Sequence, residues 1–359
     1  MGHPHWMMFA AIVILAALSA ASARQRPDTR QPTLTPQNSG TKNGLIAVSA
    51  ANARVAWACG SKGTFTLTTD GGDSWKAGVV PGAEELQFRD VEAVSDKIAY
   101  LLSVGSKPSD FRIYKTTDGG ASWTMQFQNQ DAKAFYDCFA FWTPTHGIAV
   151  SDSVDSRFPD LRTDDGKTWQ QIGAKLPAAL AGEGSFASSG TCIATQGQRN
   201  AWIATGSGKS ARILASRDGG ATWTAYDTPL PSAPGAGAFT VAFRDAHNGI
   251  LGGGNLDPKQ RDQAAAAVSR DGGKSWKITS EPPVSGAIYG LSYVGGAGSR
   301  DLARAVVITA NQGGAAWTPD EGNTWYKLPD VSGYWSVTFA GPQAGWLVGT
   351  EGRVLKISF

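Results

Sequence analysis

Short apolar runs alternate with glycine-rich polar turns along most of the chain. In residues 88–127 three runs, FRDVEAVS, IAYLLSVG and FRIYKTT, are followed by a polar turn and a fourth run, WTMQF. Runs of this length, bounded by Gly, Asp and Ser, are typical of β-strands, and no long segment after the N-terminus has the periodicity of an apolar helix. The same order of four runs recurs in residues 135–172 and 239–279. The pattern predicts an all-β protein built from four-stranded units.

One eight-residue motif, [S/T]-x-D-x-G-x-[S/T]-W, occurs six times, and its tryptophans lie 46 to 54 residues apart. The third copy, RTDDGKTW, departs from it only at Arg162. An Asp in such a turn accepts hydrogen bonds from backbone N–H groups, and the Gly permits a positive φ. The tryptophan anchors the returning strand. We therefore assign a structural role, and no catalytic one, to the motif residues Asp70, Asp118, Asp164, Asp218, Asp271, Asp320, Trp75, Trp123, Trp169, Trp223, Trp276 and Trp325.

The repeat predicts a closed ring. Four strands in each unit of about 40–50 residues are the signature of a β-propeller blade, and residues 44–359 hold six to seven such units. The last unit has three apolar runs, no motif and no fourth run. An open sheet edge favours aggregation, so residues just before 44, within 32–35, are expected to supply the missing outer strand. We predict a seven-bladed β-propeller of four-stranded blades, closed by an N-terminal strand that joins the C-terminal blade.

The N-terminus has the pattern of an export signal. Residues 9–18 are all apolar, and Ala21-Ser22-Ala23 follows as a small-x-small cleavage site. Ten apolar residues are too few to span a bilayer. We predict a cleaved signal peptide over 1–23, with an uncleaved anchor as the alternative, and a periplasmic or secreted protein without a later membrane span. Residues 24–43 are rich in Pro, Gln and Thr and are expected to be a flexible leader around the closing strand.

Charge and cysteine content limit the partners and cofactors that the chain is expected to bind. The chain has 32 basic and 30 acidic residues, a balance of +2, which argues against a nucleic-acid partner. None of the three cysteines, Cys59, Cys138 and Cys192, lies in a C-x-x-C motif, so neither a metal nor a cofactor is expected. A bridge between Cys138 and Cys192 stays open, with buried free thiols as the favoured interpretation. We expect a monomer.

The motifs resemble the Asp-box, or bacterial neuraminidase repeat, family. The longer segments DFRIYKTTDGGASW and GWLVGTEGRVLKIS are similar to the photosystem II stability/assembly factor family and its relatives. The resemblance covers residues 44–359. It implies a propeller outside the cytoplasm that performs no chemistry and binds a membrane-protein partner, and it transfers no partner-binding residue to a position of this chain. Asp-boxes also occur in sialidases and other glycan-cleaving propellers, so the fold alone does not decide the function.

The binding face can be predicted from the loops. In a four-stranded blade the Asp-boxes share one face with the loops between strands 1 and 2, whereas the long polar connections of this chain lie on the opposite face. Binding residues are usually carried by loops on a rigid scaffold. We predict Arg89, Asp90, Tyr136, Asp137, Arg157 and Asp160 as binding residues there. Aromatic residues near the starts of inner strands are expected mostly in the core between blades, with a binding rim as the alternative. Besides Tyr136 these are Phe88, Phe135, Phe186, Phe239, Tyr289, Tyr334 and Trp335.

A hydrolase is the main alternative. The closest match to the Arg motif of sialidases, Phe111-Arg112-Ile113-Tyr114, lacks the proline and precedes the second box instead of the first. A pair of carboxylates for glycoside hydrolysis is offered by Glu183 with Asp152 or Asp160. We favour a non-enzymatic scaffold that binds a protein partner in the cell envelope, with a glycan-binding or glycan-cleaving propeller as the alternative.

Overall fold

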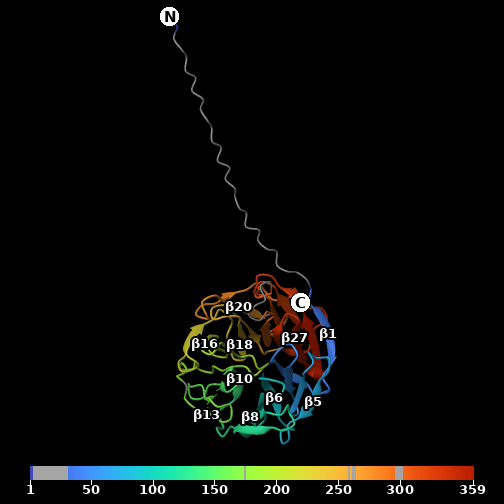
Figure 1. Cartoon of the computed structure of the whole chain (residues 1–359). Helices are drawn as coiled ribbons and strands as arrows, with labels where there is room; N and C mark the ends of the chain where they lie inside the picture. Colours follow the sequence, from blue (N-terminus) through green and yellow to red (C-terminus); the bar gives the residue numbers. More distant parts are fainter. Residues whose placement is uncertain (3–30, 174, 258, 261–263, 296–301) are drawn as a thin grey trace.

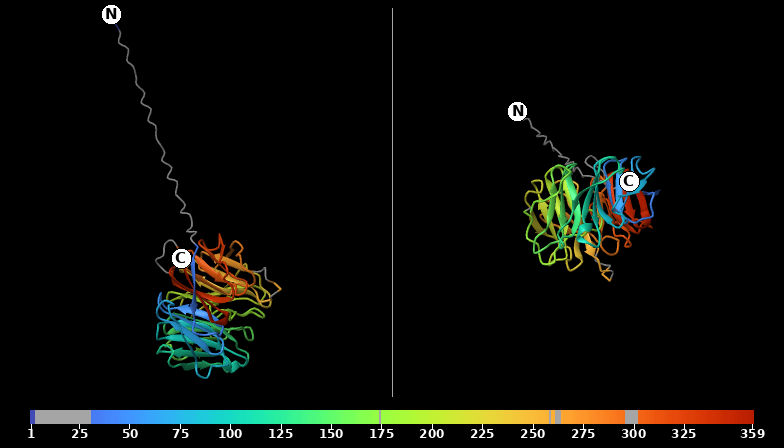
Figure 2. Two further views of the ribbon diagram at one scale, coloured as in Figure 1. Left: turned by 90° about the vertical axis from the view of Figure 1, so that its right-hand side faces the viewer. Right: turned by 90° about the horizontal axis from the view of Figure 1, so that it is seen from below.

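The chain forms seven four-stranded antiparallel sheets arranged in a ring, as the sequence predicts. A computed structural model describes residues 1–2, 31–173, 175–257, 259–260, 264–295 and 302–359. Figure 1 looks onto the ring, and its colours run once around the disc until the red C-terminal blade meets blue strand β1. Figure 2 shows the disc from two further sides. The predicted signal peptide, residues 1–23, lies almost wholly outside the described residues.

Each blade contributes one inner strand to the central channel. Adjacent inner strands contact one another around the whole ring, in the order β2, β6, β10, β14, β18, β22, β26 and back to β2. From inner to outer strand, the blades are β2 (Leu45–Ala50), β3 (Ala56–Gly60), β4 (Thr64–Thr68), β5 (Lys76–Val79); β6 (Gln87–Ala93), β7 (Ala99–Val104), β8 (Arg112–Thr116), β9 (Thr124–Gln128); β10 (Tyr136–Thr143), β11 (His146–Ser151), β12 (Asp160–Thr163), β13 (Gln170–Gln171); β14 (Ile193–Gln196), β15 (Asn200–Thr205), β16 (Arg212–Ser216), β17 (Thr224–Asp227); β18 (Ala236–Phe243), β19 (Gly249–Asn255), β20 (Ala265–Ser269), β21 (Lys277–Ile278); β22 (Gly290–Tyr293), β23 (Val306–Thr309), β24 (Ala315–Thr318), β25 (Tyr326–Lys327); and β26 (Tyr334–Gly341), β27 (Ala344–Gly349), β28 (Arg353–Ser358), β1 (Thr33–Asn38).

Strand β1 closes the ring, which confirms the predicted repair of the last blade. It pairs antiparallel with β28, from Thr33 opposite Ser358 to Asn38 opposite Arg353, so the closing strand is longer than the predicted segment 32–35. The side chain of Gln37 also accepts a hydrogen bond from Trp75 Nε1 at 3.0 Å, which ties the last blade to the first Asp-box. None of the helices among the described residues is long and apolar enough to cross a bilayer.

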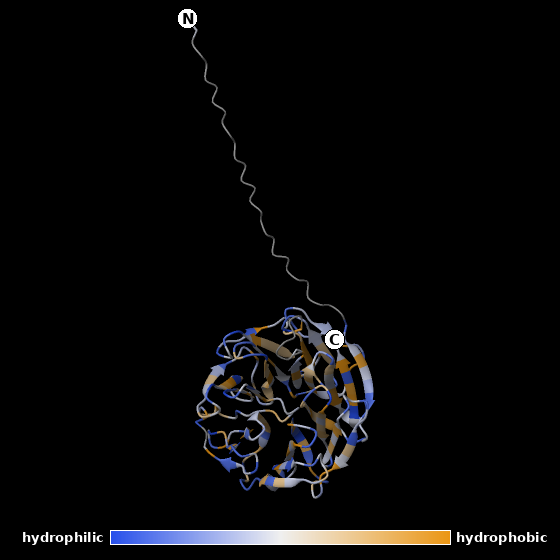
Figure 3. Cartoon of the chain, in the orientation of Figure 1, coloured by the Kyte–Doolittle hydropathy of each residue, from blue (hydrophilic) through white to orange (hydrophobic). Residues whose placement is uncertain are grey.

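The core lies between neighbouring blades. Its largest buried side chains include four tryptophans of middle strands, Trp57, Trp202, Trp317 and Trp346, whereas the box tryptophans lie nearer the surface. In Figure 3 hydrophobic residues follow the strands and hydrophilic residues gather in the outer loops. The blades are therefore held side by side mainly by apolar burial, which favours the folded state at about 25 cal/mol per Å².

The Asp-box turns have the expected geometry. In the first copy, Thr68 Oγ1 donates to Asp70 Oδ1 at 2.8 Å and accepts the Gly72 N–H at 2.8 Å. Asp70 Oδ1 accepts the Ser74 N–H at 3.0 Å. Gly71 and Gly72 have φ values of +82° and +93°, at which a residue with a side chain would be strained. The carboxylates of these aspartates accept the hydrogen bonds that hold the turns, which supports their assignment to a structural role.

In the third copy the structure corrects the box aspartate that was assigned from the sequence. Asp164, the predicted box aspartate, pairs instead with Arg162 Nε at 2.8 Å. The turn is held by Asp165, whose Oδ1 accepts the N–H groups of Lys167 and Thr168, both at 2.8 Å. Thr163 Oγ1 accepts the N–H of Gly166, three residues on, where the first copy spans four. The turn is thus one residue shorter, and alignment on the tryptophan placed the aspartate one position too early.

The sixth copy carries Glu321 at a position where most of the other copies have Gly, with a φ of +57°. Its buried carboxylate pairs with Arg244 at 2.8 Å, Arg270 at 2.7 Å and Arg304 at 3.0 Å. It also accepts the hydroxyl of Tyr293 at 3.0 Å. These contacts offset the cost of placing Glu321, a residue with a side chain, in the left-handed backbone conformation. They also join the fifth blade to the sixth.

We predict that Asp165→Ala lowers the melting temperature by a few degrees, whereas Asp164→Ala leaves it nearly unchanged. The backbone N–H groups of Thr168 and Lys167 hold the pKa of Asp165 below its usual range. The stabilisation is therefore present at neutral pH and is lost as the pH falls below about 4, so Asp165→Ala should also flatten the acid side of the stability curve. Thermal unfolding from pH 7 to pH 2 measures both effects, and equal behaviour of the two variants would contradict the assignment.

Candidate functional site

A segment between the third and fourth blades enters the central channel, and we call residues 184–191 the plug segment. Its side chains and carbonyls form hydrogen bonds with residues of four other blades. Ser189 Oγ donates to the Tyr289 carbonyl at 2.6 Å, and Ser336 Oγ donates to the Ser189 carbonyl at 3.1 Å. Thr191 Oγ1 shares a hydrogen bond with Thr240 Oγ1 at 2.7 Å. The plug segment is therefore part of the folded scaffold.

The plug segment was not predicted. The aromatic Phe186 was expected near the start of the fourth inner strand, but that strand, β14, begins only at Ile193. The plug segment instead crosses the channel, and Gly190 passes so close to Asp90 that a Cβ would lie 2.3 Å from its Oδ1. The lack of a side chain at Gly190 is what permits this crossing.

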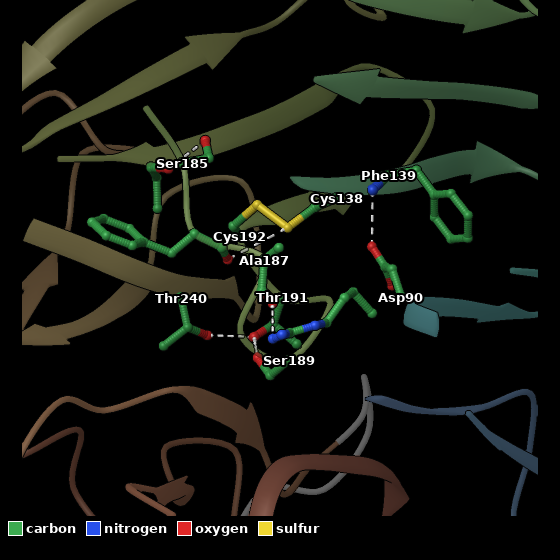
Figure 4. The surroundings of a disulfide bond; sticks show 12 residues. Asp90, Cys138, Phe139, Ser185, Ala187, Ser189, Thr191, Cys192 and Thr240 are labelled. Carbon is green, nitrogen blue, oxygen red and sulfur yellow. Dashed lines mark hydrogen bonds between the residues drawn. A yellow bond between two sulfur atoms is a disulfide. The ribbon is translucent and has the colours of Figure 1, made fainter. Parts of the chain in front are cut away.

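A disulfide anchors the plug segment. Cys138 on β10 is bonded to Cys192, which directly follows the plug segment, across 54 residues of sequence. Figure 4 shows the bond beside Ala187 and Thr191. The favoured interpretation of buried free thiols is therefore wrong for this pair, and Cys59 is a free buried thiol. The thiols meet because the plug segment brings Cys192 beside the third blade, a placement that strand spacing does not reveal.

We predict that reduction of this disulfide lowers the free energy of unfolding by about 2–4 kcal/mol, because the unfolded chain regains the entropy of the loop. Denaturant unfolding with and without dithiothreitol measures the change. The matched control is the Cys138→Ser/Cys192→Ser variant, which keeps Cys59 and should not respond to the reductant. An equal response of the wild type and the variant would mean that the bond contributes nothing.

A cavity of about 530 Å³ opens above the plug segment. It lies on the face opposite the Asp-boxes, because its walls come from the starts of inner strands and from the loops after middle strands β11, β15 and β19. Aromatic and charged groups both face it. The lining residues are Arg89, Phe135, Asp137, Asp152, Ser153, residues 182–188, Ser207, Gly235, Leu256, Tyr289 and Trp335.

Two carboxyl groups at the cavity are in direct hydrogen-bond contact, those of Asp137 and Asp152. Burial raises the pKa of Asp137 well above its usual range, and the neighbouring carboxyl of Asp152 raises it further. Burial also raises the pKa of Asp152, to about 6. Two carboxyls in contact do not both ionise readily, so the pair holds a proton at mildly acidic pH. Asp152 is fixed by the N–H of Ser185, which donates to its Oδ1 at 3.0 Å.

Arg89 is the one basic residue among the described residues that line the cavity, and its guanidinium is held by other partners. Its Nε donates to Gln87 Oε1 at 2.6 Å and its Nη1 donates to the Ala187 carbonyl at 2.9 Å. Burial lowers its pKa, while the charge of Asp137 opposes that shift. Arg89 thus supports the plug segment and places positive charge near the carboxyl pair without forming an ion pair with it.

Glu183, the proposed hydrolase carboxylate, is already occupied. Its oxygens accept from Arg212 Nε at 2.8 Å and from Arg212 Nη2, so the pair is bidentate. Thr205 Oγ1 donates at 2.6 Å and the Leu180 N–H donates at 2.8 Å. These four hydrogen bonds tie the Glu183 carboxylate into the scaffold, so it is not free to act on a ligand. The Asp137–Asp152 contact is also closer than the roughly 5–10 Å that glycoside hydrolysis requires.

The structure separates the six predicted site residues. Arg89 and Asp137 line the cavity. Asp90 lies deeper in the channel, where its Oδ2 accepts the Phe139 N–H at 2.8 Å. Tyr136 is fully buried between blades. Arg157 and Asp160 line a different hollow, of about 390 Å³, beside the loop at Leu176. Their roles as binding residues remain predictions.

The predicted aromatic residues divide in a similar way. Phe135, Phe186, Tyr289 and Trp335 line the cavity. Phe88 and Phe239 are buried, and the ring of Phe239 lies 3.8 Å from that of Phe186 between centroids. Tyr334 is partly buried and packs against the core between the last two blades. The predicted aromatic residues thus lie partly in the core and partly in the cavity wall.

The comparisons agree with this architecture. No family model and no curated protein matches the chain. Among solved structures it is similar to YCF48 bound to a D1 peptide, with a TM-score of 0.65 and 16% identity, over 93% of this chain and 99% of that chain. YCF48 from Cyanidioschyzon merolae gives 0.62 and 16% identity, over 90% and 98%. The WD40 β-propeller domain of Doa1 gives 0.52 and 13% identity, over 90% and 95%. The chain is a seven-bladed β-propeller structurally similar to YCF48.

Proposed function

We propose that this chain is a non-enzymatic propeller outside the cytoplasm that binds a segment of a partner protein in the cavity above the plug segment. The observation that carries the proposal is the cavity itself, which combines an aromatic wall with charged groups. Ligand sites are commonly concave, largely apolar and oriented by a few polar groups. The similar YCF48 structure was obtained with a D1 peptide, so a propeller of this shape accommodates a peptide ligand.

Two further observations support a location outside the cytoplasm. The sequence predicts a signal peptide over 1–23. The Cys138–Cys192 disulfide is of a kind that persists in oxidising compartments such as the periplasm. The role that we propose is therefore like that of the photosystem II assembly factors in one respect: the protein binds a protein partner in the cell envelope.

Binding is favoured over hydrolysis by the state of the acidic groups. Glu183 is held by Arg212, and the Asp137–Asp152 pair is too closely spaced for either glycosidase geometry. A glycan remains the second candidate ligand because aromatic rings such as Trp335 and Tyr289, which line the cavity, can also stack on sugars.

The test is selection of ligands from a phage-displayed library of random peptides, followed by affinity measurement on purified protein. The variant Trp335→Ala/Leu256→Ala removes two cavity-wall side chains and should weaken binding of the selected peptides at least about tenfold, as loss of buried anchors does. The control Met125→Ala/Lys274→Ala removes one exposed side chain on outer strand β9 and one on the box face and should change nothing.

Three outcomes would contradict the proposal. Equal affinity of the cavity and control variants would place the peptide site elsewhere. A failure to select any peptide, together with retention on immobilised polysaccharide, would favour the glycan ligand. Release of reducing sugar by the pure protein would show that it is an enzyme.

A further inference from the structure

The carboxyl pair in the cavity is buried without a matching cation. Asp137 is 1% exposed, and no hydrogen-bond donor among the described residues reaches its Oδ2. Among those residues, neither Asp137 nor Asp152 forms an ion pair within 4.0 Å. A buried carboxyl without a partner is costly, so proteins usually pair it or use it. Here the Asp137 carboxyl contacts the Asp152 carboxyl and accepts from the backbone N–H groups of Ala187 and Asp152, but its Oδ2 has no donor and no cation from the described part of the chain reaches it.

The charges around the pair balance only when it keeps one proton. Asp137, Asp152 and Glu183 are the acidic groups of the cavity wall, Arg89 is its basic group, and Arg212 neutralises Glu183. With both aspartates ionised, three negative charges face two positive charges, which leaves one negative charge over. With one shared proton the sum is zero. On the adjoining loops, Lys133 and Asp155 form an exposed pair that compensates itself.

We propose that the Asp137–Asp152 pair anchors one basic side chain, lysine or arginine, of the peptide that enters the cavity, a proposal that rests on the proposed function. An incoming ammonium or guanidinium supplies the single missing positive charge and donates hydrogen bonds to the pair, whose Asp137 Oδ2 is buried without a donor among the described residues. Below about pH 6 the shared proton leaves to solvent as the cation arrives, so the charges in the cavity stay balanced. Above that pH the cation neutralises a pair that is already ionised.

The wall of the cavity suits such a side chain. The rings of Tyr289 and Trp335 lie with their centroids 5.0 Å apart, and Phe135 lines another part of the cavity wall. Aromatic faces pack on the methylene stem of lysine and attract cations. Arg89 does not compete for the pair, because Gln87 and Ala187 hold its guanidinium aside.

The proposal predicts a pH dependence of binding with a definite sign. Because the pKa of Asp152 is raised to about 6, the pair gains its proton as the pH falls through that value. Protonation cancels the negative charge that the ligand needs, so affinity should be constant well above pH 6 and fall about tenfold for each pH unit below it. Guanidinium groups in general are charged throughout this range.

The experiment compares a library-selected peptide with a copy in which its basic residue is norleucine, by isothermal titration calorimetry at several pH values. At pH 7.5 the norleucine peptide should bind at least tenfold more weakly, and its affinity should not vary with pH. Asp152→Asn should remove the advantage of the basic peptide and its pH dependence. Asp155→Asn, on the same face, should change neither.

The outcomes separate this proposal from the proposed function. Equal affinity of the basic and norleucine peptides, or binding of the basic peptide unaffected by Asp152→Asn, would overturn the anchor and leave peptide binding intact. If no peptide binds at all, the proposed function fails. The anchor is then decided by nuclear magnetic resonance titration with N-acetyl-lysine methylamide: a shift lost in Asp152→Asn supports it, and no shift overturns it.

Discussion

The constraint on which this structure depends is closure of the ring. Each blade buries its faces against two neighbours, and the last blade can do so only because β1 completes it on the outside of β28. Closure fixes the distance of every inner strand from the axis. The starts of β6, β10, β18, β22 and β26 therefore converge at one end of the channel, which is how residues far apart in sequence come to share a cavity wall.

The plug segment uses the space that closure creates. Inner strand β14 spans only Ile193–Gln196, so the residues before it are free to cross the channel and to bond with four other blades. Serine and threonine hydroxyls satisfy the buried backbone there, and the disulfide fixes one end of the segment. The cavity floor is thus built from the scaffold itself.

Much of the architecture could be predicted because it repeats. Six tryptophan-ended turns reveal the blade period, and the missing fourth run of the last unit reveals the closing strand. Features that occur once were missed. Asp165 replaces Asp164 because one turn lost a residue, and the Cys138–Cys192 bond depends on the path of a segment that resembles an ordinary polar loop.

Side-chain direction was the other limit on the site prediction. Tyr136 and Asp137 are neighbours on one strand, so their side chains point to opposite faces, and only Asp137 reaches the cavity. The sequence could identify the end of the propeller and its charged residues, but the choice between adjacent positions required the register, which a bulge between Tyr136 and Cys138 shifts.

Residues 184–188 border the outer cavity and residues 189–191 border a separate space of about 200 Å³ deeper in the channel. The outer chamber is therefore a dead end along the axis of the ring. A polypeptide therefore cannot pass through the ring from face to face, and a ligand bound as we propose would enter and leave on the same face, as a chain end, a bend or a single projecting side chain.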